Sequence, residues 1–262
     1  MDLKRRAASQ IASGVRPHKD LPEFYTSHDN HTEFVSRLFD NTARHYDRIS
    51  AAVSFGTCRA YRKFALRRAG LEPGMSLLDV ATGTGLAAQA ALDLGVSPAR
   101  LVGLDPSRGM LEENQRRHAI PLVQGCGELL PFSDSSFDFI CMGYALRHVD
   151  DLEVLFLEFH RVLKPGGKVL ILEITRPNSR LVRAIAAFYL GRFLPAITRV
   201  FTGNAEAGRL LQFYWATIEE CVPPETILNV LSSCGLIQVE RWKMGGLLSD
   251  YFGIKPSLEA RA

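Results

Sequence analysis

The fold is decided by residues 77–85, Leu77-Leu78-Asp79-Val80-Ala81-Thr82-Gly83-Thr84-Gly85. The apolar run that ends at Val80 is typical of a buried parallel strand, and the glycines after it predict a tight turn into a helix that begins near Leu86. Glycine tolerates backbone conformations and close approaches that a side chain forbids. The turn therefore predicts a backbone that comes close to a ligand.

A second apolar strand, Leu101-Val102-Gly103-Leu104-Asp105, follows further along the chain. Because parallel strands end at the same edge of a sheet, Asp105 is expected beside the glycine turn. A carboxylate in that position can accept two hydrogen bonds from a ribose diol. The two strands together predict a cofactor that contains adenosine.

Two cofactors of that kind compete. Residues 83–88, Gly83-Thr84-Gly85-Leu86-Ala87-Ala88, match the G-x-G-x-x-A pattern of dinucleotide sites. A dinucleotide places its pyrophosphate at the helix N-terminus, where partial positive charge favours anions, and Asp79 would repel it. The same carboxylate suits the sulfonium and ammonium groups of S-adenosylmethionine. We therefore expect S-adenosylmethionine, since a turn that serves only as a connection would not explain the two carboxylates.

Composition limits the class of protein. The 262 residues suit one α/β domain with an added cap, and a net charge of +3 gives no footprint for nucleic acid. The N-terminus lacks the apolar core of a signal peptide, and no stretch is expected to span a bilayer, so we expect a cytoplasmic protein. The scattered cysteines predict free thiols and no metal site; they are Cys58, Cys126, Cys141, Cys221 and Cys234.

Three regions are expected along the chain. Residues 1–30 predict a flexible N-terminal arm, residues 31–70 predict helices that cover the active site, and residues 71–262 predict the cofactor-binding domain with a helical cap at about 178–220. Alternating strands and helices indicate a mostly parallel seven-stranded sheet with helices on both faces and an antiparallel last strand. Strands are expected at 76–80, 101–105, 121–125, 137–143, 168–174, 236–244 and 247–253, and helices at 85–94, 107–117, 151–163 and 223–234, with a turn at 164–167.

Several segments carry a family resemblance. The acid and glycines of residues 79–85 resemble motif I of the class I S-adenosylmethionine-dependent methyltransferases, which have a Rossmann-like α/β fold. Val53-Ser54-Phe55-Gly56 and Ala145-Leu146-Arg147-His148-Val149 more selectively resemble the C-methyltransferase family of ubiquinone and menaquinone biosynthesis, and the resemblance covers roughly residues 40–255. Other matching segments are 46–49, 128–132, 134–138, 161–167 and 172–177.

The resemblance implies a set of cofactor-binding residues. It places Tyr46 at the mouth of the site, Thr84 and the glycines at the amino-acid end of the cofactor, and Asp105 on the ribose. The full set is Tyr46, Asp79, Ala81, Thr82, Gly83, Thr84, Gly85, Asp105, Pro106, Gly125, Cys126, Gly127 and Gly143.

The chain also departs from the family pattern. Leu86 stands where Asp is common, Cys126 replaces a polar residue of the adenine loop, and His148 stands where Asn is usual. Residues 250–252 replace a His and a basic residue near the C-terminus. S-adenosylmethionine binding is compatible with these changes.

Arg147 and His148 are the candidate catalytic residues, because the end of the preceding strand is expected to face the transferred methyl group. C-methylation of a phenol or quinol develops negative charge on the ring. His148, with an ordinary pKa of about 6.5, would serve as a general base, or Arg147 would stabilise the phenolate. An ion-pair role for Arg147 and a packing role for His148 are the alternatives. The candidate substrate-binding residues are Phe188, Tyr189, Tyr214 and Tyr251.

The resemblance implies C-methylation of an apolar aromatic or polyprenyl quinol-type small molecule. An O- or N-methyltransferase of a secondary metabolite stays open, as does a non-catalytic scaffold with the same fold. Basic residues at 59–68 predict either contact with anionic lipid at a membrane surface or a solvated helix face. The oligomeric state is open, with a homodimer as one option.

Overall fold

The sheet has the predicted architecture. In the computed structural model, which describes residues 14–25, 31–54, 56–202 and 205–257, seven strands form one sheet in the order β3-β2-β1-β4-β5-β7-β6. β7 is antiparallel to both of its neighbours, and the remaining pairs are parallel. The strands are β1 (Leu77–Val80), β2 (Leu101–Asp105), β3 (Leu122–Gln124), β4 (Phe137–Gly143), β5 (Leu163–Ile174), β6 (Ile237–Met244) and β7 (Leu248–Ile254).

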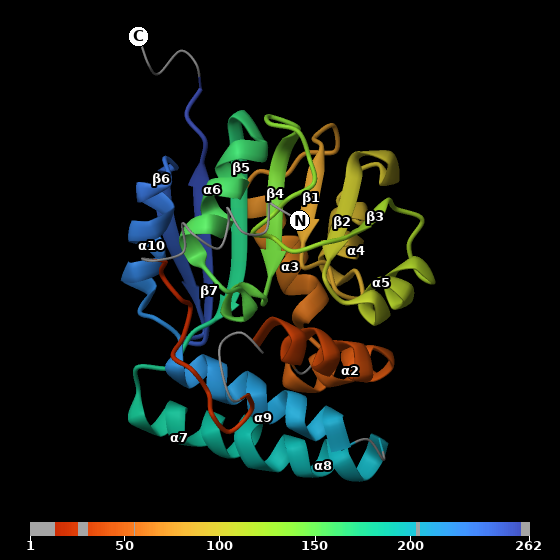
Figure 1. Ribbon diagram of the computed structural model, residues 1–262, viewed down its shortest axis with the longest axis vertical. Helices are drawn as coiled ribbons and strands as arrows, with labels where there is room; N and C mark the ends of the chain where they lie inside the picture. The colour runs from red at the N-terminus through yellow and green to blue at the C-terminus, as the bar shows by residue number, and fades with distance from the viewer. Residues whose placement is uncertain (1–13, 26–30, 55, 203–204, 258–262) are drawn as a thin grey trace.

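Helices cover both faces of this sheet (Figure 1). On one face, Phe156, Phe159 and Leu231 belong to a core shared with the central strands. On the other face, Leu66 and Ala88 belong to a second core. Small alanine side chains on α4 let that helix lie close to the sheet. The helices around the sheet are α3 (Cys58–Arg68), α4 (Leu86–Leu92), α5 (Arg108–Gln115), α6 (Leu152–Val162) and α10 (Pro224–Ser233).

Local chemistry explains where two of these helices begin. The Ser107 side chain accepts a hydrogen bond from the backbone N–H of Met110 at the start of α5. The Asp151 side chain accepts hydrogen bonds from the backbone N–H groups of Glu153 and Val154 at the start of α6. Both caps satisfy amide groups that the first helical turn leaves without a partner.

β5 begins five residues earlier than the predicted strand at 168–174. Leu163 already pairs with Phe137 of β4, and the register then shifts. The backbone N–H of Gly166 donates to the carbonyl of Lys255, and the N–H of Lys255 donates to the carbonyl of Gly167. Residues 164–167 are therefore held against the chain that leaves β7. The chain also bends there as predicted, because the register shifts between Leu163 and Lys168 and Gly166 has a φ of +78°, so only the predicted start of the strand was wrong.

The predicted cap is helical and forms layers with the N-terminal helix (Figure 1). α2 and α9 share an apolar core that includes Phe34, Leu38 and Phe213. The outer layer packs on α9 and is a continuous helix with one π-helical turn. These elements are α2 (His31–Val53), α7 (Arg180–Phe188), η4 (Tyr189–Phe193), α8 (Leu194–Thr202) and α9 (Ala205–Glu220).

The described part of the predicted N-terminal arm is not loose. The carbonyls of Val15 and Pro17 accept hydrogen bonds from the backbone of Leu152 and Val222, and the segment buries Leu21. Residues 14–25 are tied to the protein because they satisfy backbone groups of α6 and of the chain after α9. Residues 1–13 and 26–30 of the predicted arm lie outside the described residues.

Residues 180–200 also differ from the expectation that no stretch would suit a bilayer. Among the described residues, this helical stretch is the one that is long and apolar enough, by length and composition alone, to cross a membrane. Only 22% of its most apolar window is buried in the protein. Because its other side packs on α9, the stretch is a surface layer with an exposed apolar face.

Candidate active site

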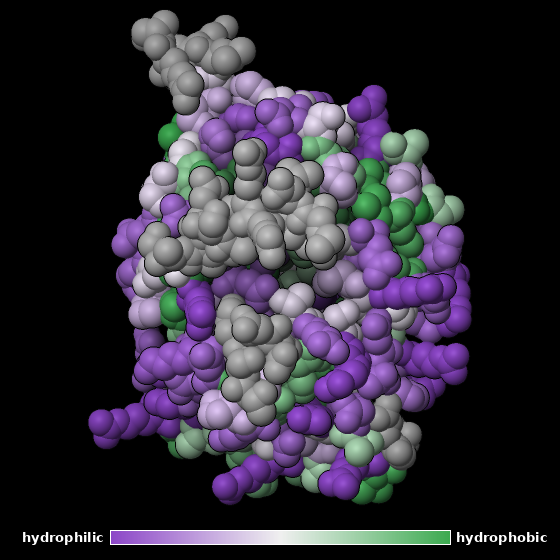
Figure 2. All heavy atoms as spheres, viewed as in Figure 1, coloured by the Kyte–Doolittle hydropathy of each residue, from purple (hydrophilic) through white to green (hydrophobic). Residues whose placement is uncertain are grey.

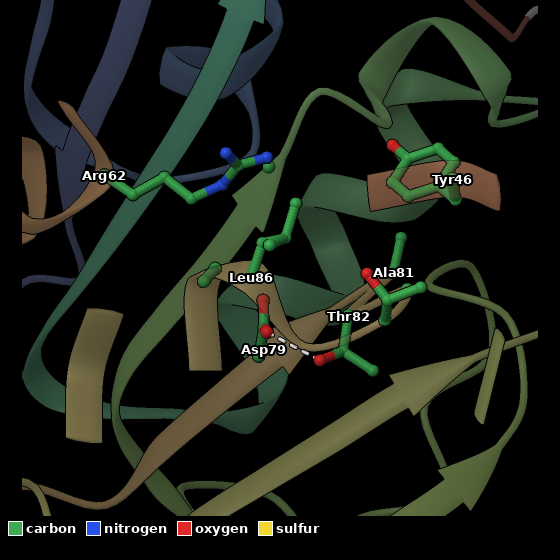
Figure 3. Close-up of a pocket in the computed structure, with 10 residues that line it drawn as sticks. Tyr46, Arg62, Asp79, Ala81, Thr82 and Leu86 are labelled. Atoms are coloured by element: carbon green, nitrogen blue, oxygen red, sulfur yellow. Dashed lines mark hydrogen bonds between the residues drawn. The ribbon is translucent and has the colours of Figure 1, made fainter. Parts of the chain in front are cut away.

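The glycine turn after β1 opens onto a pocket (Figure 3). Gly83 and Gly85 have φ angles of +55° and +88°, which favour glycine. A Cβ atom added to Gly83 would meet no atom within 4 Å, whereas one added to Gly85 would lie 2.5 Å from Cδ2 of His118 and 2.7 Å from Oδ1 of Asn114. Gly85 is therefore needed for packing against the α5 side, whereas the space beside Gly83 is open.

Asp79 points into this pocket from β1. Its carboxylate is 1% exposed, and Oδ2 accepts a hydrogen bond of 2.7 Å from Oγ1 of Thr82. Oδ1 has no hydrogen-bond partner among the described residues. Burial raises the pKa of Asp79 to about 6, against the opposing effects of the Thr82 hydrogen bond and the Arg62 charge. A buried carboxylate with an open acceptor atom is suited to a cationic ligand group.

Arg62 enters the same pocket from α3 and is a functional candidate that sequence reasoning missed. Its side chain is 4% exposed, and its Nε has no hydrogen-bond partner among the described residues. Nη1 donates to the carbonyl of Cys58 and also contacts the Cys58 sulfur. The sequence contained one signal for Arg62, which is its helical spacing from the apolar residues Ala65 and Leu66 on the buried side of α3.

Asp105 lies at the end of β2 and supports the glycine turn. Its two oxygens each accept a hydrogen bond of 2.8 Å, from the backbone N–H of Gly83 and from that of Ser107. Burial raises the pKa of Asp105 to about 7 despite these two bonds, and the Asp79 and Asp40 charges add to the rise. The carboxylate is therefore preorganised beside the turn, and its contact with a ribose stays a prediction.

The pocket collects seven of the predicted cofactor-binding residues and three others. The predicted ones are Tyr46, Asp79, Ala81, Thr82, Gly83, Thr84 and Gly143, and the others are Arg62, Leu86 and Ala87.

The remaining predicted cofactor-binding residues do not line this pocket. The carbonyl of Pro106 accepts a hydrogen bond from Gln124, and the N–H of Gly125 donates to the carbonyl of Asp105. A Cβ atom on Gly127 would lie 2.5 Å from Cδ1 of Leu155, so this glycine lets α6 pack closely. Those not lining the pocket are Gly85, Asp105, Pro106, Gly125, Cys126 and Gly127.

Two aspartates of α2 hold this helix against the cofactor pocket. Asp47 accepts a hydrogen bond of 2.5 Å from Oγ1 of Thr84. Asp40 accepts hydrogen bonds from Oγ of Ser107, at 2.6 Å, and from the backbone N–H of Gly109, at 2.8 Å. α2 is thereby tied to the chain at the carboxyl ends of both β1 and β2.

Tyr46 connects the pocket with an aromatic cluster between α2 and α9. Its hydroxyl lies 2.8 Å from the hydroxyl of Tyr214, and burial raises the pKa of both phenols. Both hydroxyls are therefore neutral at physiological pH. Phe39 packs within 6.3 Å of both tyrosine rings, measured between ring centroids.

Arg147 is a fully buried ion-pair residue. Its Nε donates to Oε1 of Glu173 at 2.8 Å, and Nη1 donates to Oγ1 of Thr217 at 2.7 Å. The guanidinium carbon also lies 5.4 Å from the centre of the Tyr214 ring. Arg147 thus joins the ends of β4 and β5 to α9, which is the alternative role that the sequence left open.

His148 lies in an aromatic environment. Its ring is stacked on Phe213 and contacts Phe39 and Tyr214 at their edges, with centroid distances of 5.3–5.7 Å. Burial and, secondarily, the charge of Arg147 lower its pKa well below the ordinary value of 6.5. This shift argues against a base that titrates near neutral pH, because the fold desolvates the imidazole.

The predicted substrate-binding residues separate into two groups. Tyr189 and Tyr214 pack against the aromatic cluster, and the Tyr189 hydroxyl donates to the carbonyl of Ala52. Phe188 is 61% exposed on α7, and Tyr251 is 1% exposed within the core that α10 covers. Phe188 and Tyr251 therefore do not lie with the other two. Phe188 faces outward from α7, and the pleat of β7 turns Tyr251 into the core.

Among the described residues, no group of three or more His, Cys, Asp or Glu side chains is placed to hold a metal ion.

A mostly parallel sheet with this strand order, a glycine turn after β1 and buried carboxylates on β1 and β2 constitute the fold of the class I S-adenosylmethionine-dependent methyltransferases. The sequence profile of the ubiE/COQ5 methyltransferase family matches residues 26–255, and the chain belongs to that family. S-adenosylmethionine is accordingly the methyl donor.

Known relatives agree with this assignment. The demethylmenaquinone methyltransferase of Desulfitobacterium hafniense is 31% identical over 85% of this chain and 90% of its own length. That of Staphylococcus aureus is 33% identical over 85% of this chain and 93% of its own length. That of Corynebacterium efficiens is 37% identical over 66% of this chain and 74% of its own length.

Solved structures share the fold at lower identity. The phosphoethanolamine N-methyltransferase 2 of Haemonchus contortus, in complex with S-adenosyl-L-methionine, has a TM-score of 0.61 at 19% identity and covers 91% of this chain and 62% of its own. A methyltransferase of Thermotoga maritima has a TM-score of 0.59 at 20% identity and covers 84% of this chain and 98% of its own.

Proposed function

We propose that this protein C-methylates the ring of a reduced quinone that carries an apolar, polyprenyl-type tail. The observation that carries the proposal is the position of Tyr46, which lines the cofactor pocket and also bonds to Tyr214 in the aromatic cluster. A flat aromatic acceptor at this junction would lie between the methyl donor and apolar side chains. The names of the curated relatives support the same chemistry.

The pocket fits the amino-acid end of S-adenosylmethionine. The carboxylate of the cofactor suits Arg62, whose Nε has no hydrogen-bond partner among the described residues. The ammonium group of the cofactor suits Asp79, whose Oδ1 likewise has no partner among these residues. The two side chains belong to different elements and line the same small pocket (Figure 3). Gly83 also lines this pocket, and the space beside it is open. We infer that Arg62 and Asp79 together bind this zwitterion and so set the direction of the cofactor.

Bound in this way, S-adenosylmethionine supplies a methyl group that its sulfonium has already activated. The protein must then hold the acceptor carbon in line with that methyl group and exclude water. Correct positioning of two reactants can lower a barrier by about 7–11 kcal/mol. The apolar core between α2 and α9 excludes water from this side of the site.

Tyr46 and Tyr214 are suited to stabilise the negative charge that develops on the quinol oxygen. Both hydroxyls stay protonated because burial raises their pKa, so one of them can donate a hydrogen bond to a phenolate. The positive charge of Arg147 acts in the opposite direction on the pKa of Tyr214, which makes that hydroxyl a better donor. We infer that Arg147 is a positioning residue that acts through Tyr214.

The test is an anaerobic assay with a 2-polyprenyl-1,4-naphthoquinol and S-adenosylmethionine. The expected product carries one additional methyl group on the ring carbon, which mass spectrometry and proton NMR identify. The oxidised quinone serves as the control and is expected to give no product, since it lacks the electron-rich ring. A methyl group on oxygen would favour the O-methyltransferase alternative, and cofactor binding without turnover on any quinol would favour a non-catalytic role.

We also propose a cytoplasmic location. The support is chemical, because all five cysteines are free thiols, as expected in a reducing compartment. Fractionation of cells that express the protein at native levels tests this proposal, and recovery from an extracytoplasmic fraction would contradict it.

A further inference from the structure

The outer helical layer of the cap exposes apolar side chains on one side. Leu181, Ile185 and Phe188 follow a helical spacing on α7 and are 70%, 59% and 61% exposed. Phe193 and Val200 continue the exposed apolar surface along η4 and α8, and we call these five residues the apolar stripe. Hydrophobic and hydrophilic residues alternate along the lower edge of the molecule in Figure 2, where α7 and α8 lie in Figure 1. Exposed large apolar residues that recur along one side of a helix are typical of an interaction surface.

The charged residues within the segment that carries the apolar stripe all have one sign. Residues 176–202 contain five arginines and neither aspartate nor glutamate. Arg183 pairs with Glu219 of α9, which ties the layer to the cap. The arginines are Arg176, Arg180, Arg183, Arg192 and Arg199.

A basic cavity adjoins the start of α7. It has a volume of about 190 Å³ and lies between residues 176–179 and the hairpin that joins β6 to β7. Arg176, Arg241 and Lys243 line it, together with exposed Val182. Arg241 is held in place by a hydrogen bond of 3.0 Å from its Nε to Oγ of Ser249. Three cations around one cavity, with no acidic residue in its lining, are suited to a phosphate group.

We propose that the apolar stripe and the basic cavity form one docking surface for an anionic lipid bilayer. The stripe enters the boundary between headgroups and acyl chains, and the cavity takes the phosphate of an anionic lipid. Helices that lie in this boundary combine an apolar face with arginine or lysine on the flanks, as α7 and α8 do. The surface is a different one from the basic residues of α3, of which Arg59 pairs with Asp93 and Arg62 is buried.

Charge favours a lipid over a second copy of this chain. In a two-fold symmetric contact each stripe would face the other, and their arginines would meet without an acidic partner on the stripe. An anionic membrane surface supplies the missing negative charge. This inference goes beyond the proposed reaction and does not depend on it, because the surface contains no residue of the cofactor pocket.

The experiment is co-sedimentation of the full chain with vesicles of phosphatidylcholine alone or mixed with phosphatidylglycerol. The wild-type protein is expected to bind the mixed vesicles, and the binding should weaken as salt is added. Arg176→Ala with Lys243→Ala should lower the partition coefficient about thirtyfold, which corresponds to roughly fivefold for each cation. Leu181→Ser with Ile185→Ser should lower it on both kinds of vesicle.

The matched control is Lys63→Ala with Arg67→Ala, which removes the same charge from α3 and should leave vesicle binding unchanged. Circular dichroism and S-adenosylhomocysteine titration establish that every variant is folded. Equal losses in the control variant would overturn the placement on the cap and favour α3. Absence of vesicle binding, binding of soluble glycerol phosphate only, or a dimer that the Leu181 and Ile185 changes dissociate would each overturn the lipid surface.

Discussion

Replacement of Arg62 by Met tests the proposed orientation of the cofactor. Met keeps much of the side-chain volume on the buried side of α3 and removes the charge and the donors. A hydrogen bond to a charged group contributes about 1.5–3 kcal/mol, so the Kd for S-adenosylhomocysteine should rise about 10- to 150-fold. The upper part of this range is expected because Arg62 is only 4% exposed, and solvent screens the interaction little.

The assay compares two ligands by isothermal titration calorimetry. S-adenosylhomocysteine contains the amino-acid end, whereas 5′-deoxy-5′-methylthioadenosine lacks it. Arg62→Met should weaken only the first ligand, because the second has no carboxylate for Arg62 to bind. Loss of the Arg62 charge is expected to raise the pKa of Asp79 further. The titrations are therefore made at pH 8, so that Asp79 stays ionised in the variant.

The matched control is Arg59→Met on the same helix. Arg59 is 63% exposed and pairs with Asp93 on the surface, so its loss should change the affinity for neither ligand. Equal weakening of both ligands by Arg62→Met would show a general distortion of the pocket. Unchanged binding of S-adenosylhomocysteine would refute the role of Arg62 directly.

Four further predictions concern other buried ionisable groups. Arg147→Met leaves the Glu173 carboxylate buried without its cation, so the free energy of unfolding should fall by about 3–5 kcal/mol, while Arg147→Met with Glu173→Met should regain most of it. Denaturation in urea measures the stability of both variants, and an Arg147→Met variant as stable as the wild type would contradict the ion pair. Normal turnover by the double variant would contradict the proposed effect of Arg147 on Tyr214. The affinity for S-adenosylhomocysteine should fall as pH drops through about 6, because a protonated Asp79 cannot pair with the ligand ammonium. Asp79→Asn should remove this component in calorimetry and leave only the component near pH 7 that Asp105 contributes. The raised pKa of Asp79 also means that its contribution to ligand-free stability is present below about pH 4 and is lost as pH rises through about 6. The melting temperature of the wild type, relative to Asp79→Asn, should therefore decline over that interval. His148→Asn should leave the rate–pH profile above pH 6 unchanged, since burial keeps the imidazole neutral there; loss of an acidic limb near pH 6.5 would restore His148 as the base.

Local sequence patterns determined most of the fold. The apolar runs at 77–80 and 101–105, the glycines between them and the alternation of strands and helices were sufficient to predict the sheet and its antiparallel last strand. These features depend on neighbours a few residues apart, which the sequence displays directly. The early start of β5 was missed, because the bonds that hold residues 164–167 come from Lys255, far along the chain.

The residues of the site also fall into those that the local sequence predicted and those that depend on tertiary packing. Asp79, Gly83 and Asp105 were predictable, since each follows from the order of strand, turn and strand. Arg62 was missed: its spacing from Ala65 and Leu66 places it on the apolar side of α3, but this spacing does not reveal that the guanidinium reaches the cofactor pocket. Only the packing of α3 against the sheet turns Arg62 towards the pocket that Asp79 lines.

The sequence by itself thus determined the class of fold and the cofactor, because short-range periodicity and glycine geometry are properties of the local chain. The tertiary structure decided the charges and environments of the reacting region. Arg147 meets Glu173 only when β4 and β5 lie side by side, and His148 loses its basicity only when Phe213 of α9 stacks on it. Desolvation and ion pairing arise between residues distant in sequence, so they exist only once the chain has packed.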